Sequence, residues 1–332
     1  MTVQELKDVA APVPVPVRPG VAPWVFHDGA LVPFAEVGLP LTTQALQYGT
    51  GVFEGIRAYA VAGRPGELSI FRAHDHYERF LRSCRLLRID VKHTAEELVE
   101  RTFDLLRRNA VAHDTYLRPI AYKLGLLPGT PPGVRLTGLS ESVSITAFTL
   151  GAYTPPGGIR CAISSWSRPR SSAIPVQAKV TGGYVNSALA VEEARAAGHD
   201  DAILLNDRGQ VAEASTANVF ALRDGHLITP PPSADLLPGI TRDTVRVLAE
   251  AMGVETRERD LQVPDLLTAD EVFLTGTGVG ITPVVAVAGR PVGDGAPGPL
   301  TTRIVEAYDR TVRGAGDPRH DHWLTIVPIE RG

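Results

Sequence analysis

The pattern of apolar and polar positions along this chain changes several times between a helical period and a strand period. Residues 94–109 open with Thr-Ala-Glu-Glu, which has the form of a capping box, and continue with apolar side chains at helical spacing. A second amphipathic helix is expected to open at residues 237–241, and an Ala-rich helix should follow Gly183. The pattern therefore predicts three helices at well-separated places in the chain.

Other runs have the composition of strands. Trp24-Val-Phe-His-Asp28-Gly29 predicts a hairpin with Asp-Gly as its turn, because this pair suits the positive φ angles of a two-residue turn. Further strands are expected at residues 53–60, 68–71, 115–122, 142–149, 159–165, 201–205, 213–222 and 271–275. Helices and strands do not alternate with the regular spacing of a doubly wound sheet, which predicts an α+β fold.

The length of the chain and the breaks in its pattern predict two domains. At 332 residues the chain is too long for one minimal core. We expect a Pro-rich arm at residues 1–23, a smaller N-terminal domain at 24–150 and a larger C-terminal domain at 159–332. The Gly- and Pro-rich residues 151–158 should form the linker between the two domains.

Composition and charge exclude several classes of protein. Hydrophobic residues make up 44% of the chain, and the net charge of −4 gives no basic field for nucleic acid. No apolar run approaches the roughly 20 residues of a membrane span, and the first residues lack the pattern of a signal peptide. A cytoplasmic protein is therefore expected. The histidines have no third ligand group nearby in sequence, so no metal site is expected.

Two side chains are candidates for chemistry on a phosphate-bearing aromatic aldehyde such as pyridoxal phosphate. Lys179 precedes a Gly-Gly turn and a helix, where its amine can reach a bound ligand and form an imine. Glu213 is a candidate partner for the pyridine nitrogen, which must stay protonated if the ring is to withdraw electrons. Taken alone, each would more often be a solvated surface charge.

Two glycine-containing turns are candidates for anion binding. Residues 237–241 (Leu-Pro-Gly-Ile-Thr) stand before a helix, whose free N–H groups can bind a phosphate, although plain capping by Thr241 explains the pattern equally well. Residues 276–280 (Gly-Thr-Gly-Val-Gly) follow a strand and offer a second group of exposed N–H donors. A dinucleotide site is not favoured there, because Pro283 and Pro291 interrupt any long helix.

With these motifs in place, the sequence resembles the branched-chain amino acid aminotransferases of the class IV, fold type IV, pyridoxal-phosphate enzymes. The resemblance runs from about residue 24 to residue 308 and rests on several motifs in the right order. They are residues 47–57 (QYGTGVFEGIR), 71–74 (FRAH), 116–119 (YLRP), the segment around Lys179, 213–220, 237–243 (LPGITRD) and 276–283.

The resemblance implies a cofactor, pyridoxal 5′-phosphate, between a smaller N-terminal and a larger C-terminal domain. Lys179 would form the internal aldimine and carry the proton, Glu213 would pair with the pyridine nitrogen, and Tyr184 would bind the ring hydroxyl. The other cofactor residues implied are Arg72, Gly239, Ile240, Thr241 and Thr277 around the phosphate, with Thr216 and Leu237 beside the ring. The substrate-binding residues implied are Tyr48, Phe53, Gly55, Tyr116, Arg118, Gly276, Thr277 and Gly278.

The implied activity is ping-pong transamination between L-branched-chain amino acids and 2-oxoglutarate. Tyr116 and the turn at 277–278 would bind the α-carboxylate, and Arg118 would bind the distal carboxylate of glutamate. The resemblance also implies a homodimer or larger assembly, in which Tyr48 and the loop near 125–133 reach the neighbouring subunit's site. Amino acids and 2-oxo acids are thus the expected small-molecule partners.

Other activities of the same class remain alternatives. They are D-amino acid or (R)-amine transamination, aminodeoxychorismate lyase chemistry, and a specialised-metabolism aminotransferase. Tyr116, Arg118 and the complete 48–57 motif favour the L-branched-chain activity, whereas Ser215 and the Gly278-Val-Gly280 turn depart from the usual family pattern and leave the amino acid preference open. A non-catalytic scaffold would be expected to lack Lys179, Glu213 or Arg72, and all three are present in this chain.

Overall fold

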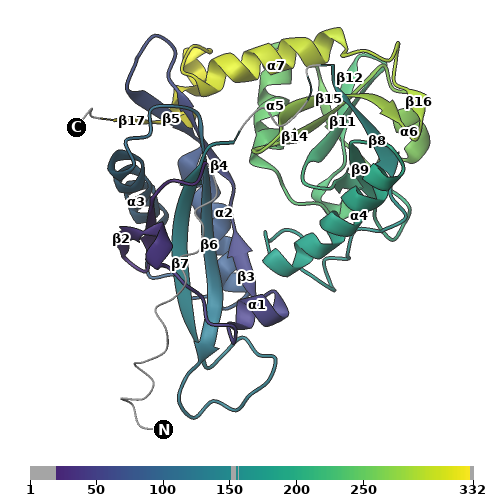
Figure 1. The fold of residues 1–332 in the computed structure, drawn as a ribbon. Coiled ribbons are helices and arrows are strands. Elements are labelled where there is room, and N and C mark those ends of the chain that lie inside the picture. The colour runs from purple at the N-terminus through teal and green to yellow at the C-terminus, as the bar shows by residue number, and fades with distance from the viewer. Residues whose placement is uncertain (1–19, 151–154, 156, 330–332) are drawn as a thin grey trace.

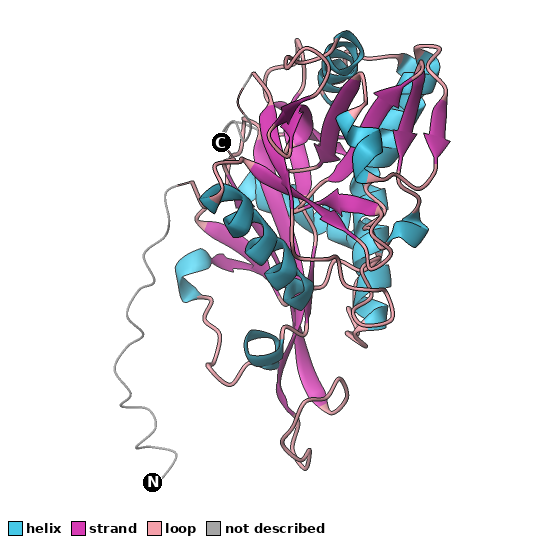
Figure 2. Cartoon of the chain, turned by 90° about the vertical axis from the view of Figure 1, so that its right-hand side faces the viewer, coloured by secondary structure: helices cyan, strands magenta, loops and turns pink. Residues whose placement is uncertain are grey.

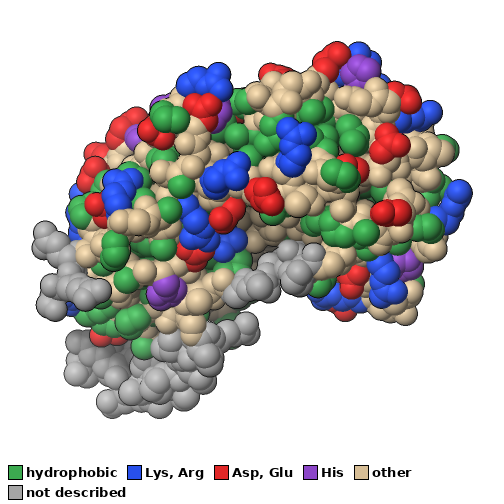
Figure 3. Space-filling view, turned by 90° about the horizontal axis from the view of Figure 1, so that it is seen from above, with side chains coloured by type: hydrophobic (Ala, Val, Ile, Leu, Met, Phe, Trp, Pro, Cys, Tyr) green, Lys and Arg blue, Asp and Glu red, His purple; other side chains and the backbone are tan. Residues whose placement is uncertain are grey.

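The chain forms two β-sheets, each covered by helices, with a site between them (Figure 1). The computed structural model describes residues 20–150, 155 and 157–329. Most of the predicted Pro-rich arm and most of the predicted linker at 151–158 lie outside the described residues. Within the described part of the chain, no helix is long and apolar enough to cross a membrane. Acidic and basic side chains are interspersed over the face seen from above (Figure 3).

The first sheet is antiparallel throughout and has the strand order β17-β5-β4-β6-β7-β1-β2, with β3 paired to β6. Its strands are β1 (Trp24–His27), β2 (Ala30–Pro33), β3 (Gly51–Phe53), β4 (Ile56–Ala60), β5 (Glu67–Phe71), β6 (Thr115–Leu126), β7 (Leu139–Phe148) and β17 (Leu324–Pro328). The helices of this part are η1 (Phe34–Glu36), α1 (Gln44–Tyr48), α2 (Ala73–Leu86) and α3 (Ala95–Arg108). The β6–β7 hairpin extends beyond the rest of the sheet (Figure 2).

Two local sequence predictions in this part are confirmed. Asp28 and Gly29 have φ angles of 45° and 95° at the turn between β1 and β2. A two-residue hairpin turn that matches the right-handed twist of its strands requires such positive angles. The capping box at the start of α3 is present: the Thr94 side chain accepts from Glu97 N–H, and the Glu97 side chain accepts from Thr94 N–H. Local chemistry therefore sets both the entry into the sheet and the start of α3.

The second sheet is mixed and has the strand order β10-β9-β8-β15-β14-β11-β12-β13, with β16 on β15. Its strands are β8 (Ile159–Ile163), β9 (Asp201–Leu205), β10 (Val211–Ala214), β11 (Asn218–Arg223), β12 (His226–Thr229), β13 (Thr256–Glu258), β14 (Glu271–Gly276), β15 (Gly280–Val287) and β16 (Arg290–Pro291). The helices of this part are η2 (Thr181–Gly183), α4 (Tyr184–Ala196), η3 (Pro232–Ala234), α5 (Ile240–Ala251), α6 (Val263–Leu267), α7 (Pro299–Val312) and η4 (Pro318–Trp323).

The structure differs from the sequence prediction at residues 213–222, where one strand was expected. The chain makes two strands, β10 and β11, because Ala214 N–H donates to the Ala217 carbonyl at 2.7 Å and closes a tight turn. This turn, residues 215–217, lies against the cavity described below. The prediction of a single strand is therefore wrong, and the break serves the site.

The C-terminal segment connects the two sheets. Helix α7 packs beside α5 on the second sheet, and β17 then joins the edge of the first sheet next to β5. One core cluster accordingly contains Phe71 from the first sheet together with Phe220 and Phe273 from the second. The final strand is thus not part of the second sheet, although residues 159–332 were expected to form one domain.

Candidate active site

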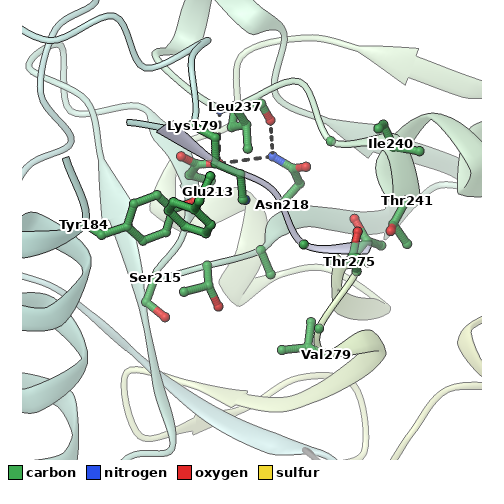
Figure 4. Close-up of a pocket in the computed structure, with 18 of the residues that line it drawn as sticks. Lys179, Tyr184, Glu213, Ser215, Asn218, Leu237, Ile240, Thr241, Thr275 and Val279 are labelled. Atoms are coloured by element: carbon green, nitrogen blue, oxygen red, sulfur yellow. Dashed lines mark hydrogen bonds between the residues drawn. The ribbon is translucent and has the colours of Figure 1, made fainter. Parts of the chain in front are cut away.

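A cavity of about 430 Å³ lies between the two sheets and is lined by residues from both (Figure 4). The first sheet contributes β3 and the first half of β6, while the second contributes the turn after β10, the start of α5 and the β14–β15 turn. A volume of this size is typical of a site for a cofactor or other small molecule.

Lys179 stands in the segment between β8 and α4, which packs against α2 and β3 of the first-sheet part. Its N–H donates to Ser83 Oγ on α2 at 3.3 Å, and its carbonyl accepts from Phe53 N–H at 3.0 Å. The Nζ atom lies 5.2 Å from the ring centre of Phe53 and 5.4 Å from that of Tyr184. No carboxylate of the described residues lies within 4.0 Å of this amine. Lys179 is therefore placed in the cavity with its amine available to a ligand.

Glu213 is buried at the floor of the cavity, with only 5% of its surface exposed. Its carboxylate accepts from Arg168 Nη2 at 2.8 Å, and from Asn218 Nδ2 and Leu237 N–H, both at 3.2 Å. Burial raises the pKa of Glu213, and the guanidinium of Arg168 only partly offsets this effect. A cationic N–H donor bound beside it would favour the ionised carboxylate.

The first turn of α5 presents unpaired backbone donors to the same cavity. Gly239 is the N-cap and makes no side-chain cap, and the first hydrogen bond closing this turn is from Asp243 N–H to the Gly239 carbonyl. The N–H groups at Ile240 and Thr241 thus have no helical acceptor. A Cβ at position 239 would overlap Asn218 Oδ1, so only glycine allows this close approach. The predicted phosphate site has the geometry of an anion site.

Two arginines from the α2 region lie near this helix terminus, but only one reaches the cavity. Arg79 lines the cavity, and its Nη1 donates to the Pro238 carbonyl at 2.8 Å. Arg72, the predicted phosphate residue, lines an outer groove instead, which shares Arg79, Gly239 and Ile240 with the cavity. Its guanidinium donates to Asp75 at 2.5 Å, to Asp243 at 2.6 Å and to the Ile240 carbonyl at 3.3 Å. These contacts occupy Arg72 behind the helix terminus, away from the cavity.

The first sheet forms the opposite wall. The Arg118 guanidinium lies over the ring of Phe53, 4.6 Å from its centre, and donates to the Tyr116 hydroxyl at 3.2 Å. No acid among the described residues lies within 4.0 Å of Arg118, so its charge is available to a ligand. A Cβ at Gly55 would overlap the Tyr116 hydroxyl, which explains why glycine follows Glu54 here.

The last wall is the β14–β15 turn, a hairpin turn in which Gly276 pairs with Gly280. Gly276, Thr277 and Gly278 all line the cavity. The strand that follows excludes the helix that a dinucleotide site would need, as the two prolines predicted. Thr275 Oγ1 at the end of β14 is buried without a hydrogen-bond partner in the described part of the chain, and its residue also lines the cavity.

Comparison with known proteins places the chain in a family. Residues 51–287 match the model of "Amino-transferase class IV". A probable branched-chain-amino-acid aminotransferase of Aquifex aeolicus is 42% identical over 92% of this chain and 96% of its own length. The chain belongs to the class IV aminotransferases. The Escherichia coli branched-chain-amino-acid aminotransferase is 38% identical over 92% of this chain and 98% of its own.

Solved structures of class IV aminotransferases share the fold. The Thermoproteus uzoniensis branched-chain aminotransferase, crystallised with norvaline, has a TM-score of 0.85 at 41% identity and covers 92% of this chain and 99% of its own. The Thermobaculum terrenum branched-chain amino acid aminotransferase, in its pyridoxal-phosphate form, has a TM-score of 0.86 at 33% identity, with 92% and 99% covered. The predicted family and the α+β, fold type IV architecture are therefore confirmed.

Most of the site residues predicted for this class IV aminotransferase line the one cavity. They are Phe53, Gly55, Tyr116, Arg118, Lys179, Tyr184, Glu213, Thr216, Leu237, Gly239, Ile240, Thr241, Gly276, Thr277 and Gly278. Arg72 and Tyr48 do not line it, and Tyr48 is 45% exposed on α1. Sequence reasoning missed Arg79, Arg168 and Asn218. Arg79 stands three residues after His76 and four before Ser83, and this helical spacing was the available signal for it.

Proposed function

We propose that this class IV aminotransferase is a pyridoxal-phosphate-dependent transaminase. It would transfer the amino group of leucine, isoleucine or valine to 2-oxoglutarate by a ping-pong reaction. The observation that carries the proposal is the arrangement of Lys179, Glu213 and the α5 N-terminus around one cavity. These groups supply an amine, an acceptor for the ring nitrogen and an anion site, and the named relatives act on branched-chain amino acids.

The donor and acceptor set fits the cofactor. The Glu213 carboxylate would accept the pyridinium N–H, and the Tyr184 hydroxyl would meet the ring hydroxyl. The backbone of Ile240 and Thr241 would hold the phosphate, and Arg79 is better placed than Arg72 to add a charge there. Thr277 would complete this anion site, with Thr216 and Leu237 beside the ring. When bound, the cofactor supplies an aldehyde for the amino group and a ring that withdraws electrons.

The protein would supply the proton transfer and the substrate orientation. Lys179 Nζ is the amine in the cavity that can hold the aldehyde carbon and afterwards carry a proton between substrate and cofactor carbons. Tyr116 and the turn at Gly278 would orient the α-carboxylate. Arg118 would bind the distal carboxylate of glutamate, whereas an apolar side chain would pack beside Phe53.

The proposal is tested by absorbance spectra of the purified chain, first alone and then with single amino donors. We expect an absorbance band of the imine between Lys179 and the cofactor aldehyde, near the edge of the visible region. This band should disappear on addition of leucine, isoleucine, valine or glutamate. D-Alanine and (R)-1-phenylethylamine serve as the comparison donors. A band that responds only to these two donors would overturn the L-branched-chain assignment, and the absence of any band after pyridoxal phosphate is added would overturn the cofactor assignment.

We also propose that the chain acts as a homodimer in the cytoplasm. Leu41 and Leu46 near α1 are 84% and 63% exposed, and Val185 on α4 is 63% exposed. The end of α1 and the start of α4 are adjacent, because Gly182 N–H donates to the Gly49 carbonyl at 3.2 Å. Exposed apolar side chains gathered in this way are typical of a protein interface. The two free, buried cysteines suit a reducing compartment.

Sedimentation of Leu46→Asp tests the dimer. A charge in the interface should shift the chain toward the monomer at micromolar concentration, whereas Leu86→Asp, at an exposed leucine on α2, should not. Equal sedimentation of both variants and the unmodified chain as a dimer would place the interface elsewhere.

A further inference from the structure

Glu54 is a fully buried carboxylate directly behind the cavity. Its neighbours Phe53 and Gly55 both line the cavity, whereas Glu54 does not, because successive side chains of an extended segment point to opposite sides. Its carboxylate faces α2 and accepts from Arg79 Nε at 2.7 Å and from Arg79 Nη2 at 2.9 Å. Phe53 and Gly55 therefore line the substrate wall, while Glu54 between them contacts Arg79, which lies near the anion site.

A second α2 side chain completes this contact. His76 Nδ1 lies 2.9 Å from Glu54 Oε2, and only 1% of the residue is exposed. Burial lowers the pKa of His76, so at neutral pH the imidazole is neutral and donates its Nδ1–H to the carboxylate. Burial alone would raise the pKa of Glu54, but Arg79 and His76 hold it well below its ordinary value.

These contacts fix which N–H groups of Arg79 remain for a ligand. Nε and Nη2 each donate to Glu54, and Nη1 donates to the Pro238 carbonyl at 2.8 Å. Three of the five N–H donors of the guanidinium are used within the described residues, which leaves one on Nη1 and one on Nη2. Arg79 lines the cavity beside Ile240 and Thr241, whose backbone donors are also unpaired.

We infer that Glu54 and His76 are positioning residues for the phosphate end of the cofactor site. They orient the two remaining donors of Arg79 toward an anion at the α5 terminus. The inference rests on the proposed function and adds to it the separate roles of three residues. Arg79 contacts the phosphate, whereas Glu54 and His76 act only through Arg79 and never touch the ligand.

A purely structural ion pair would behave differently. Loss of stability accompanies the replacement of any buried partner, but in a purely structural pair it would weaken every ligand of the site by a similar factor. A positioning pair affects the phosphate selectively, because pyridoxal and pyridoxal phosphate share the ring and the aldehyde and differ only at that group. The ratio of their dissociation constants therefore measures the role of Glu54 directly.

The experiment titrates the full-length chain with pyridoxal phosphate and with pyridoxal, following the absorbance of the lysine adduct. In Glu54→Gln we expect the dissociation constant for pyridoxal phosphate to rise about tenfold, the loss typical of one charge-assisted contact. The constant for pyridoxal should stay within about twofold. Glu78→Gln is the matched control, because Glu78 lies on the same helix as Arg79, is largely exposed and, among the described residues, forms an ion pair with Arg82 alone.

His76→Gln provides a milder second variant in case Glu54→Gln does not fold, with a loss in the same direction. The double variant Glu54→Gln, Arg79→Gln should lose no more phosphate preference than Arg79→Gln alone. Equal weakening of both ligands in the single variants, or an unchanged preference for the phosphate, would overturn the inference. If the unmodified chain bound neither ligand, the proposed function itself would fail.

Discussion

Two buried carboxylates flank the cavity, and their surroundings differ in one decisive respect. Glu54, on the side of the first sheet, is held by a two-point contact to Arg79 and by a hydrogen bond from His76, and these two partners keep its pKa low. Glu213, on the side of the second sheet, has a single contact to Arg168 and two longer hydrogen bonds, and burial keeps its pKa raised. The charge of Glu54 is thus compensated by its protein partners, whereas the charge of Glu213 is compensated only in part and would be stabilised by a further cationic donor.

This difference indicates what each side of the site does. A saturated buried carboxylate can only hold its partners in place, so the first sheet supplies fixed geometry and substrate contacts. A buried carboxylate that is incompletely compensated binds a further N–H donor with a gain in free energy. The second sheet therefore supplies the groups that change the electronic state of a ligand. Changes on the second side should affect the rate with every substrate. On the first side, changes in the substrate wall should discriminate between substrates, and changes at Arg79 or its partners should weaken the contact to the phosphate.

The largest effect is expected where the two sides meet, at Lys179. Lys179→Ala should lower the transamination rate by roughly 10⁴-fold or more with every amino donor, since no other amine replaces Nζ in bond formation and proton transfer. Steady-state rates with leucine and with glutamate provide the measurement. Lys92→Ala, at an exposed lysine, is the control. Substantial turnover by Lys179→Ala without an added amine rules out the assigned role.

Glu213→Gln should lower the rate by about 10²-fold with both donor classes while the cofactor stays bound, because a neutral amide no longer keeps the pyridine nitrogen protonated. The cofactor content and the rate of each half-reaction should be measured on the same sample. A rate near that of the unmodified enzyme would mean that another group serves the ring nitrogen, and the contrast between the two carboxylates would then lose its functional meaning.

The two arginines of the α2 region provide a test of the anion site. Arg79→Gln should weaken pyridoxal phosphate binding by about 10- to 100-fold, since a charged contact to the phosphate is lost. Arg72→Ala should weaken it only a few-fold, because Arg72 is engaged with Asp75 and Asp243 outside the cavity. Cofactor release during dialysis ranks the variants. Faster release from Arg72→Ala than from Arg79→Gln would restore the assignment made from sequence.

Arg118→Met should discriminate between substrates. Without the guanidinium, KM for glutamate and 2-oxoglutarate should rise roughly 10-fold or more, and KM for leucine should change little. Kinetics on both donors, together with a melting curve, separate this outcome from lost stability. Equal losses for leucine and glutamate would contradict the selective role.

The smallest effect expected is on the pH dependence of stability. Because the folded-state pKa of Glu54 is lowered from 4.5, its contribution is fully present above pH 4.5 and is lost as the pH falls below that value. The melting temperature of Glu54→Gln should therefore lie below that of the unmodified chain at pH 7, with a narrower gap near pH 4. The pKa of Glu213 is raised, so its ionised form does not stabilise the folded chain. Glu213→Gln should therefore not lower the melting temperature at pH 7 in this way. Thermal scans of cofactor-free samples at several pH values provide the comparison.

The sequence was sufficient wherever the signal is local. The Asp28–Gly29 turn, the α3 capping box and the residues of the α5 terminus follow from short motifs. It was insufficient for α2, because polar His76, Arg79 and Ser83 occupy buried positions and interrupt the apolar stripe. Inside the protein they contact Glu54, the Pro238 carbonyl and Lys179 N–H around the cavity. The return of β17 to the first sheet also carries no local signal, since its partner β5 lies more than 250 residues earlier.

The side-chain amide of Asn218 has a consequence for the length of ligand that fits. Its Nδ2 donates to Glu213 at 3.2 Å and to the Leu237 carbonyl at 2.9 Å (Figure 4). Its Oδ1 lies so close to Gly239 that a Cβ there would overlap it. One rigid planar group thus spans the acceptor for a ring nitrogen and the helix terminus for an anion. Because the Asn218 amide contacts both Glu213 and the α5 terminus, neither group can shift without the other, and the amide sets the spacing between them. Only a ligand whose nitrogen and phosphate are separated by that spacing can satisfy both ends at once.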